Sequence, residues 1–156
     1  MVEVEVTRTG LNIKLTVYGE PVAQGRPRFS TRGGFVKAFD PEKSVNYKET
    51  IRAYTNDVHK KLPEFKPFDT AIKVSVAVFR NVPKSFSKKA RKEALEGARR
   101  PISRPDNDNY LKGILDALNG VLWTDDARIV DLSCQKWYSD QPRIEVTITS
   151  HVKAGA

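Results

Sequence analysis

The sequence contains little cysteine or histidine and no long hydrophobic run, and each shortage excludes a class of protein. Its one cysteine, Cys134, has no partner for an internal disulfide and rules out zinc or iron–sulfur sites built from several cysteines. The two histidines, His59 and His151, are too few for a histidine-rich metal centre and do not suit a hydrolytic triad. No apolar stretch approaches the roughly 20 residues that span a bilayer. The first six residues alternate acids with valines and do not resemble a signal peptide, so a cytoplasmic protein is expected.

Length and composition indicate one folded domain with an excess of positive charge. At 156 residues the chain has room for one hydrophobic core and is short for two, so residues 1–156 are predicted to form a single domain. A composition of 39% hydrophobic and 29% charged residues is too apolar for a disordered protein. The 27 Lys and Arg residues outnumber the 19 Asp and Glu residues, which gives a net charge of +8. This excess favours a polyanionic partner.

The positive charge is concentrated in two segments, and an acidic segment directly follows the second. Residues 84–104 carry eight Lys and Arg against two Glu, and residues 24–37 carry four with no acid. Residues 105–131 reverse the balance, with six Asp against one Lys and one Arg. Either basic segment alone suits a solvated face, but phosphates bind basic surfaces and divalent metals bind carboxylate clusters. The residues predicted to contact nucleic-acid phosphates are Arg26, Arg28, Arg32, Lys88, Lys89, Arg99, Arg100 and Arg104.

Alternating apolar residues predict the strands of a mixed sheet. The clearest alternation lies at residues 71–79, where every second residue is isoleucine or valine. The two glycines at 33 and 34 suit a tight hairpin between Arg32 and Phe35. The predicted strands cover Val2–Thr7, Asn12–Tyr18, Ala71–Phe79, Arg128–Tyr138 and Arg143–Ser150.

Three helices are predicted between these strands. The first follows Pro41, has apolar residues at steps of three and four, and ends before Pro63. Ser87 is a suitable N-cap for a short basic helix. The third helix covers Asn109–Asn119, and its buried face is predicted to carry Leu111, Leu115, Leu118 and Leu122. This order of elements indicates an α+β domain with a mixed sheet and with helices packed mainly on one face.

The segment Pro105-Asp-Asn-Asp-Asn109, which precedes the third helix, is the most informative for function. In an extended segment, the side chains of Asp106 and Asp108 point the same way and can share one metal ion. The alternative is that Asp108 or Asn107 caps the helix, because the helix dipole favours acids at that end. The pair of acids by itself favours the capping interpretation.

Further acids and a lysine favour the metal site. Asp108, Lys112 and Asp116 are spaced four residues apart and form one stripe of the helix. The stripe is either a ladder of ion pairs or a place where an ammonium group stands beside metal-binding carboxylates. Asp125 and Asp126 follow the helix, and the connecting chain is long enough to bring a third carboxylate to the first two. Three acids and a lysine beside basic loops suit phosphodiester hydrolysis with Mg²⁺.

The residues from Arg104 to Val130 form a long, ordered pattern. It reads D-x-D-N, a Lys four residues after the second Asp, D-A-L, and then an aromatic residue before D-D and an apolar pair. This pattern resembles the signature of the RusA family of Holliday-junction resolvases. Residues 19–29, Gly-Glu-Pro-Val-Ala-Gln-Gly-Arg-Pro-Arg-Phe, also resemble the phage and prophage members of that family. Together the two segments cover about a quarter of the chain.

The resemblance implies a RusA-like fold and a homodimeric crossover junction endodeoxyribonuclease. Such an enzyme resolves four-way (Holliday) DNA junctions by paired symmetric cuts in DNA recombination and repair. The implied cofactor is Mg²⁺, for which Mn²⁺ is expected to substitute, and no small-molecule cofactor or membrane is expected. The implied catalytic residues are Asp106, Asp108, Lys112 and Asp126. The three aspartates are the implied metal ligands, with Asp125 as a further candidate.

Two alternatives remain open at this point. A less selective nuclease that acts on forks, flaps or other branched DNA would share the same four site residues. A non-catalytic, basic nucleic-acid-binding protein would instead interleave aromatic side chains with its basic residues for base stacking. Phe29, Phe35 and Phe39 provide some of this pattern in the first basic segment, whereas the second has only Phe86.

Overall fold

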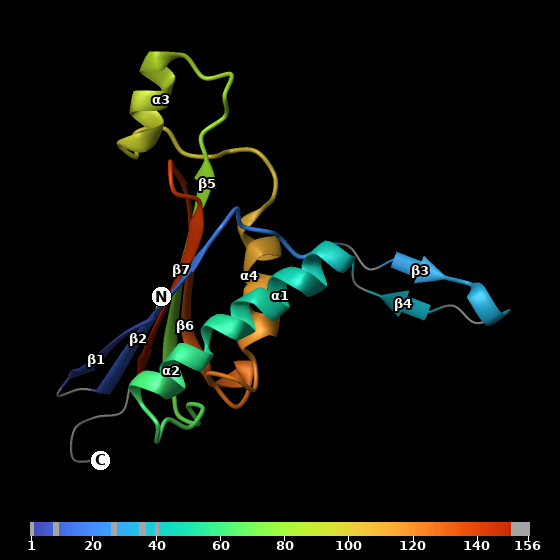
Figure 1. Cartoon of the computed structure of the whole chain (residues 1–156), viewed down its shortest axis with the longest axis vertical. Coiled ribbons are helices and arrows are strands. Elements are labelled where there is room, and N and C mark those ends of the chain that lie inside the picture. Colours follow the sequence, from blue (N-terminus) through green and yellow to red (C-terminus); the bar gives the residue numbers. More distant parts are fainter. Residues whose placement is uncertain (1, 8–9, 26–27, 35–36, 40, 151–156) are drawn as a thin grey trace.

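The protein is built around a five-stranded sheet (Figure 1). The computed structural model describes residues 2–7, 10–25, 28–34, 37–39 and 41–150. The strands of this sheet are β1 (Val2–Thr7), β2 (Gly10–Tyr18), β5 (Ile72–Asn81), β6 (Ile129–Ser139) and β7 (Arg143–Ser150). β1 and β7 have the predicted bounds, and the ends of the other three differ from the prediction by no more than two residues.

The sheet is mixed because one of its pairs is parallel. The strand order is β1-β2-β7-β5-β6. Neighbouring strands are antiparallel from β1 to β5, whereas β6 runs parallel to β5. A parallel pair needs a crossover connection, and residues 82–128 supply it through two helices. The predicted mixed sheet is therefore confirmed, with β6 as one of its edges among the described strands.

One face of the sheet is aliphatic and forms the core. The registers place Val74 of β5 opposite Ile148 of β7, and Ile148 opposite Ile13 of β2. Burying one such side chain contributes about 1.5–3 kcal/mol to folding. The buried residues of this face are Ile13, Leu15, Val17, Ile72, Val74, Val76, Val78, Ile144, Val146 and Ile148.

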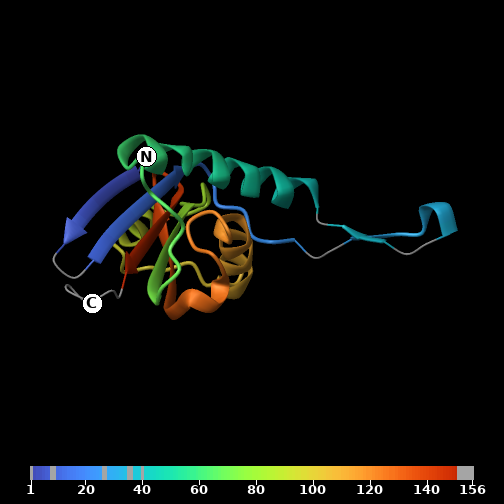
Figure 2. The ribbon, with the colours of Figure 1, turned by 90° about the horizontal axis from the view of Figure 1, so that it is seen from below.

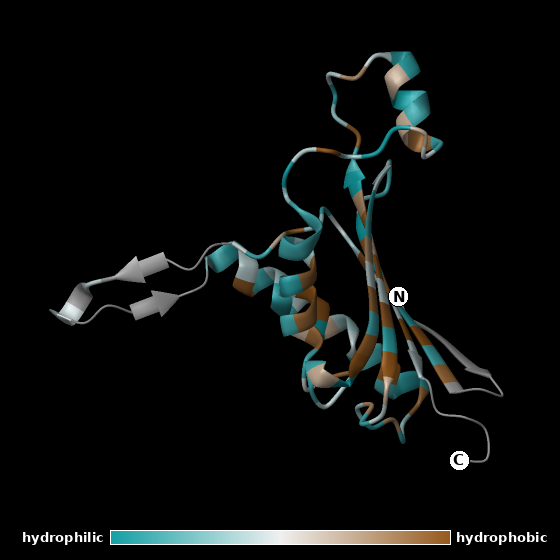
Figure 3. Ribbon diagram, turned by 180° about the vertical axis from the view of Figure 1, so that it is seen from behind, coloured by the Kyte–Doolittle hydropathy of each residue, from teal (hydrophilic) through white to brown (hydrophobic). Residues whose placement is uncertain are grey.

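The helices lie mainly on this aliphatic face. Their bounds are α1 (Glu42–Tyr54), α2 (Asn56–Lys61), α3 (Lys88–Leu95) and α4 (Asn107–Leu118). α1 and α4 lie side by side against the sheet (Figure 2), and the brown strand residues in Figure 3 run beside them. α3 lies beyond the end of β5 and contacts β6 (Figure 1). Within the described ranges, no helix combines the length and apolarity needed to cross a membrane.

Two details of the helices differ from the prediction. The first predicted helix is divided at Thr55 into α1 and α2. α4 begins two residues earlier than predicted, and its fully buried side chains include Ile114 and Leu118 but not Leu111 or Leu115. The leucines at 111 and 115 lie at the margin of the contact because the stripe that faces the sheet is rotated toward Tyr110.

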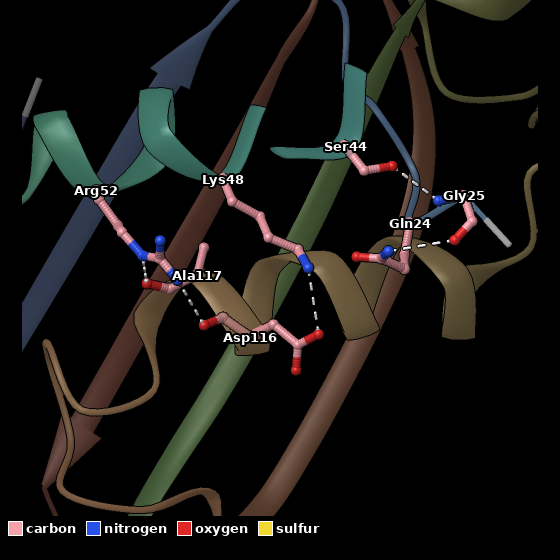
Figure 4. A network of polar contacts seen from close by, with 7 residues as sticks. All are labelled: Gln24, Gly25, Ser44, Lys48, Arg52, Asp116 and Ala117. Atoms are coloured by element: carbon pink, nitrogen blue, oxygen red, sulfur yellow. Dashed lines mark hydrogen bonds and ion pairs between the residues drawn. The ribbon is translucent and has the colours of Figure 1, made fainter. Parts of the chain in front are cut away.

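Polar contacts fasten α1 to the end of α4 (Figure 4). Arg52 Nε donates a hydrogen bond to the carbonyl of Ala117 at 3.1 Å, and its Nη2 donates to the carbonyl of Asp116 at 3.4 Å. Lys48 Nζ lies 3.5 Å from a carboxylate oxygen of Asp116. The last carbonyls of a helix have no partner within it, so Arg52 satisfies two of these in α4.

The first basic segment forms a separate hairpin. β3 (Arg28–Ser30) and β4 (Lys37–Phe39) pair antiparallel on either side of the 3₁₀ turn Arg32–Gly34. Gly33 and Gly34 both have φ +81°, which glycine adopts readily. The hairpin extends away from the sheet beyond the start of α1 (Figures 1 and 2). A hairpin is present here, but the predicted two-residue turn between Arg32 and Phe35 is wrong, because the innermost paired residues described are Ser30 and Lys37.

Candidate active site

Asp106 and Asp108 lie at the N-terminus of α4. Asp106 is the N-cap residue, yet its side chain accepts no capping hydrogen bond. Asp108 is in the first turn, and both side chains are exposed. The prediction that the two acids share a side of an extended segment is wrong, because helical backbone begins at Asn107. Neither carboxylate is used as a helix cap, so both remain available at an end where the dipole favours anions.

The start of α4 is fastened to the sheet and to the segment before the hairpin. Asn107 Nδ2 donates to the carbonyl of Cys134 in β6 at 3.2 Å. The backbone N–H of Gln24 donates to the carbonyl of Asn109 at 3.0 Å. Burial raises the pKa of the Cys134 thiol to about 11, so the thiol stays protonated at neutral pH and does not act as a nucleophile. Cys134 therefore supports the position of the acids and takes no chemical role.

Lys136 fixes the segment that leads into Asp106. Its Nζ donates to the carbonyls of Ser103 at 3.1 Å and Pro105 at 3.2 Å. Arg80 Nη1 donates to the carbonyl of Ser103 as well, also at 3.1 Å. The sequence analysis missed both basic residues. The local signal for Lys136 is that it interrupts the alternation of Val130, Leu132 and Cys134, whereas its position opposite the buried Val78 is known only from the structure.

We expect Lys136→Met to destabilise the protein. Methionine keeps the apolar stem of the side chain but leaves two carbonyls without their donor, which costs about 1–3 kcal/mol in the free energy of unfolding. Urea denaturation measures the loss. Lys73→Met is the matched control, because Lys73 is an exposed lysine on β5, and its loss should change the free energy of unfolding by less than about 0.5 kcal/mol. Equal effects of the two substitutions would contradict the role given to Lys136.

Lys112 stands one turn after Asp108 with its side chain exposed. The predicted stripe of Asp108, Lys112 and Asp116 is present on α4, and all three residues are exposed. The alternative ion-pair ladder is absent among the described residues, because Asp116 pairs with Lys48 and Lys112 forms no ion pair with any of them. The Lys112 ammonium is therefore free to meet an anion near the start of the helix.

Asp125 and Asp126 lie in a short loop before β6, within and beside the 3₁₀ turn Asp126–Arg128. Asp125 caps this turn by accepting a hydrogen bond from the backbone N–H of Ala127 at 3.0 Å. Asp126 Oδ1 accepts from Nε1 of the fully buried Trp123 at 2.7 Å. This bond holds the Asp126 carboxylate in one orientation and leaves its second oxygen available.

Asp106 and Asp108 fit Mg²⁺ by their chemistry, but the expected return of Asp126 to this pair is not seen, because Asp126 lies beside Trp123 at the other end of α4. Over the described ranges, no group of three or more carboxylate, cysteine or histidine side chains is close enough to hold a metal. Mg²⁺ is usually held by one or two carboxylates together with water and substrate phosphates, so a preformed cage is not required. Asp106 and Asp108 offer oxygen ligands that no other described side chain occupies.

A cleft lies beside this helix end. It has a volume of about 610 Å³ and is bounded by residues 20–25, by the start of α1 and by the start of α4. Arg80 and Arg104 line it, and Gly25 closes one side, where its N–H donates to Ser44 Oγ at 2.9 Å (Figure 4). The side-chain oxygen of Gln24, which also lines the cleft, is buried without a hydrogen-bond partner among the described residues. The cleft thus places cationic and amide groups, together with the carboxylate of Glu20, beside the first turn of α4.

The predicted basic residues fall into three groups. Arg26 and the side chains of Arg28 and Arg32 lie outside the described part of the chain. Lys88 and Lys89 are exposed in the first turn of α3, and Arg104 is exposed beside the cleft. The remaining two, Arg99 and Arg100, are exposed but take part in contacts within the protein.

Arg99 and Arg100 attach α3 and its following loop to the rest of the molecule. Arg99 Nη2 lies 2.9 Å from a Glu93 oxygen. Arg100 Nε donates to the carbonyl of Lys136 at 2.6 Å, and its guanidinium lies 3.3 Å from the centre of the Trp137 ring. These two arginines therefore shape the basic surface as well as adding charge to it.

Comparison with known proteins assigns the chain to a family. The family model described as "Endodeoxyribonuclease RusA" matches residues 18–149, which include every predicted catalytic position. The chain belongs to the RusA family. This RusA-family protein is also similar to "Uncharacterized protein YqaN" of Bacillus subtilis (strain 168), at 47% identity over 138 residues. The match covers 87% of this chain and 94% of the Bacillus protein. Family membership indicates an endodeoxyribonuclease.

Proposed function

We propose that this RusA-family protein is a Mg²⁺-dependent homodimer that resolves four-way DNA junctions by paired symmetric cleavage. The observation that carries the proposal is the exposed start of α4, where Asp106, Asp108 and Lys112 have no ion-pair partner among the described side chains. The cationic residues of the cleft adjoin this helix end, and α3 carries further lysines beyond the end of β5. A DNA phosphate that approaches this helix end meets two carboxylates and one ammonium group, with basic residues nearby.

In the proposed reaction, the protein binds and orients one phosphodiester at the start of α4. Lys112 Nζ donates to a non-bridging oxygen of the scissile phosphate and offsets the negative charge that grows there. Arg104 contacts a neighbouring phosphate, because it is exposed directly before the acids. Asp126 is held by Trp123, so that its available oxygen has a defined direction.

Asp106 and Asp108 would hold the metal ion. Asp126 lies at the opposite end of α4, because it is bonded to Trp123, which pairs with Asn119 just after the helix. A bound Mg²⁺ supplies an activated water and neutralises charge on the phosphate. Both ligands are oxygen donors, which suits Mg²⁺ and also Mn²⁺. Asp125 uses one oxygen to cap the 3₁₀ turn and Asp126 uses one to accept from Trp123, so hydrogen bonding does not rank one above the other as a ligand.

The homodimer part of the proposal follows from the substrate and from an open sheet edge. Paired symmetric cuts need two sites related by a two-fold axis, and a C₂ dimer is the commonest oligomer. β6 has no second neighbour among the described strands, and it exposes Val130 by 59% and Leu132 by 47%. An edge strand with exposed apolar residues readily pairs with another copy of itself. Sedimentation equilibrium is expected to give twice the 17.6 kDa mass of the chain.

A nicking assay tests the activity. The protein is mixed with a labelled four-way junction, a replication fork, a flap and a linear duplex, each with Mg²⁺ or with EDTA. We expect opposed cuts in two strands of the junction with Mg²⁺, no cleavage with EDTA and little cleavage of the duplex. Equal cleavage of forks and flaps would favour the less selective nuclease. Binding without any cleavage would favour the non-catalytic protein.

Lys88 and Lys89 are expected to contribute electrostatically to DNA binding. Replacing both by Gln should weaken binding to junction and duplex alike and lower the slope of log affinity against log salt by about two units. Fluorescence anisotropy over a range of salt concentrations measures the slope. Lys60→Gln with Lys61→Gln is the control, because these lysines end α2 at the opposite end of the molecule (Figure 1). An unchanged slope for the α3 variant would make its lysines an ordinary solvated surface.

A further inference from the structure

One apolar side chain stands apart from the rest of the surface. Ile102 is 96% exposed, whereas Val130, the next most exposed large apolar residue described, is 59% exposed. Isoleucine is among the residues most often buried. Ile102 lies in the loop between α3 and α4, which passes over the ends of β5 and β6 (Figure 1). Single exposed apolar residues are common, so the surroundings of Ile102 decide whether its exposure has a use.

The backbone on the N-terminal side of Ile102 is held in place. Pro101 is buried. Before it, Arg100 is hydrogen-bonded to the carbonyl of Lys136 and stacked on the ring of Trp137. Proline also removes the freedom of its own φ angle. The chain therefore enters Ile102 from a fixed point.

The C-terminal side is held equally firmly. The carbonyl of Ser103 accepts hydrogen bonds from both Arg80 Nη1 and Lys136 Nζ, each at 3.1 Å. The carbonyl of Pro105 accepts a further bond from Lys136 Nζ at 3.2 Å. With both flanks fastened, Ile102 cannot turn back onto the surface to bury its side chain. Several contacts therefore hold in place a loop whose isoleucine faces solvent.

The charge and position of this loop suit DNA. Arg104 follows Ile102 by two residues and has an exposed side chain, and the whole segment of residues 84–104 carries eight Lys and Arg against two Glu. Asp106 follows Ile102 by four residues, so their Cα atoms are at most about 14 Å apart. At a rise of about 3.4 Å per base pair, this distance is about four base pairs. A base step beside the scissile phosphate is therefore within reach of Ile102.

We propose that Ile102 is an apolar wedge that inserts between bases at the branch point of the DNA. Apolar side chains of this size unstack base steps in other DNA-binding proteins, and the extra contacts repay the cost of unstacking. Base pairs next to a branch have incomplete stacking and open more easily than pairs within a duplex. Ile102 thus favours binding of branched DNA over linear DNA. The proposed cleavage site lies nearby, at Asp106 and Asp108. This inference rests on the proposed function and adds a residue that selects the substrate.

Fluorescence of 2-aminopurine tests the wedge without requiring cleavage. The base is placed beside the branch point of a four-way junction, and binding is followed in EDTA. We expect the emission to rise when the wild-type protein binds, because an unstacked 2-aminopurine is brighter. Ile102→Ala should lose this rise and reduce the preference for junction over duplex at least about tenfold, because three buried carbons are removed. Ile102→Leu should keep both properties.

The controls separate this inference from the function on which it rests. Leu95→Ala removes an exposed leucine from α3 in the same basic segment and should leave the emission and the junction preference unchanged. Urea denaturation should give the same midpoint for all variants, since both side chains are on the surface. If Ile102→Ala keeps the emission rise and the preference, the wedge is wrong, whether or not the junction is cut. If the wild type opens the branch point through Ile102 but cuts no branched DNA, the wedge stands and the proposed function fails. If the wild type cuts junctions without any rise in emission, only the wedge fails.

Discussion

Asp106→Asn and Asp108→Asn are each expected to abolish cleavage of a four-way junction while leaving junction binding intact. An amide has nearly the shape of a carboxylate but carries no charge, so it coordinates Mg²⁺ poorly. Loss of a metal-held water and of charge neutralisation removes the largest contributions to phosphodiester hydrolysis. Binding should be equal or tighter, because a negative charge that faces phosphates is removed. Single-turnover cleavage with Mg²⁺ and anisotropy binding in EDTA measure the two effects separately.

Asp140→Asn is the matched control for these variants. Asp140 is an exposed aspartate in the turn between β6 and β7, away from the start of α4. Its replacement should leave both cleavage and binding at the wild-type level. Cleavage by Asp106→Asn at close to the wild-type rate would show that this acid only favours the start of a helix, and would remove the metal from the proposed mechanism.

Lys112→Ala is expected to lower the single-turnover cleavage rate by about 100-fold or more, the usual effect of removing one group that stabilises a transition-state charge. The side chain is exposed and forms no ion pair with a described residue, so the free energy of unfolding should change by less than about 0.5 kcal/mol. Lys112→Arg should restore the rate only in part, because a planar guanidinium does not place its charge where a compact ammonium does.

Lys60→Ala provides the comparison for Lys112→Ala. Lys60 is an exposed lysine on α2 whose side chain pairs with Asp57 at the surface, at 3.6 Å. Its loss should affect neither cleavage nor stability. If Lys112→Ala instead destabilised the fold and kept full activity per folded molecule, Lys112 would be a structural residue of α4.

Local features of the chain are enough to predict most of the elements and the main candidate residues. Residues 71–79 alternate so regularly that the strand is evident, and its bounds differ from those of β5 by no more than two residues. Ser87 was predicted as an N-cap, and its hydroxyl accepts a hydrogen bond from the backbone N–H of Ala90 at 3.1 Å. These features depend on residues within a few positions of one another, so they can be read directly from the sequence.

The motif around Asp106 could also be found from the sequence, but its geometry could not. The pattern from Arg104 to Val130 predicted the RusA family, which the family model confirms. The direction of the acids was wrong because helical backbone begins at Asn107, and the contacts of Asn107 with β6 come from a residue 27 positions away. Neither alternation nor capping preference contains that information.

The remaining features depend on tertiary structure because they join residues that are distant in the chain. Lys136 supports the loop before Asp106 from a residue 31 positions beyond Pro105, and no local pattern couples the two. The bond between Trp123 and Asp126 joins residues only three positions apart, but its direction depends on where the core buries the indole. Periodicity along the chain determines which residues form strands and helices. The packing of β6 against α4 and its preceding loop determines which side chains are held at the start of α4, and it leaves Ile102 facing solvent.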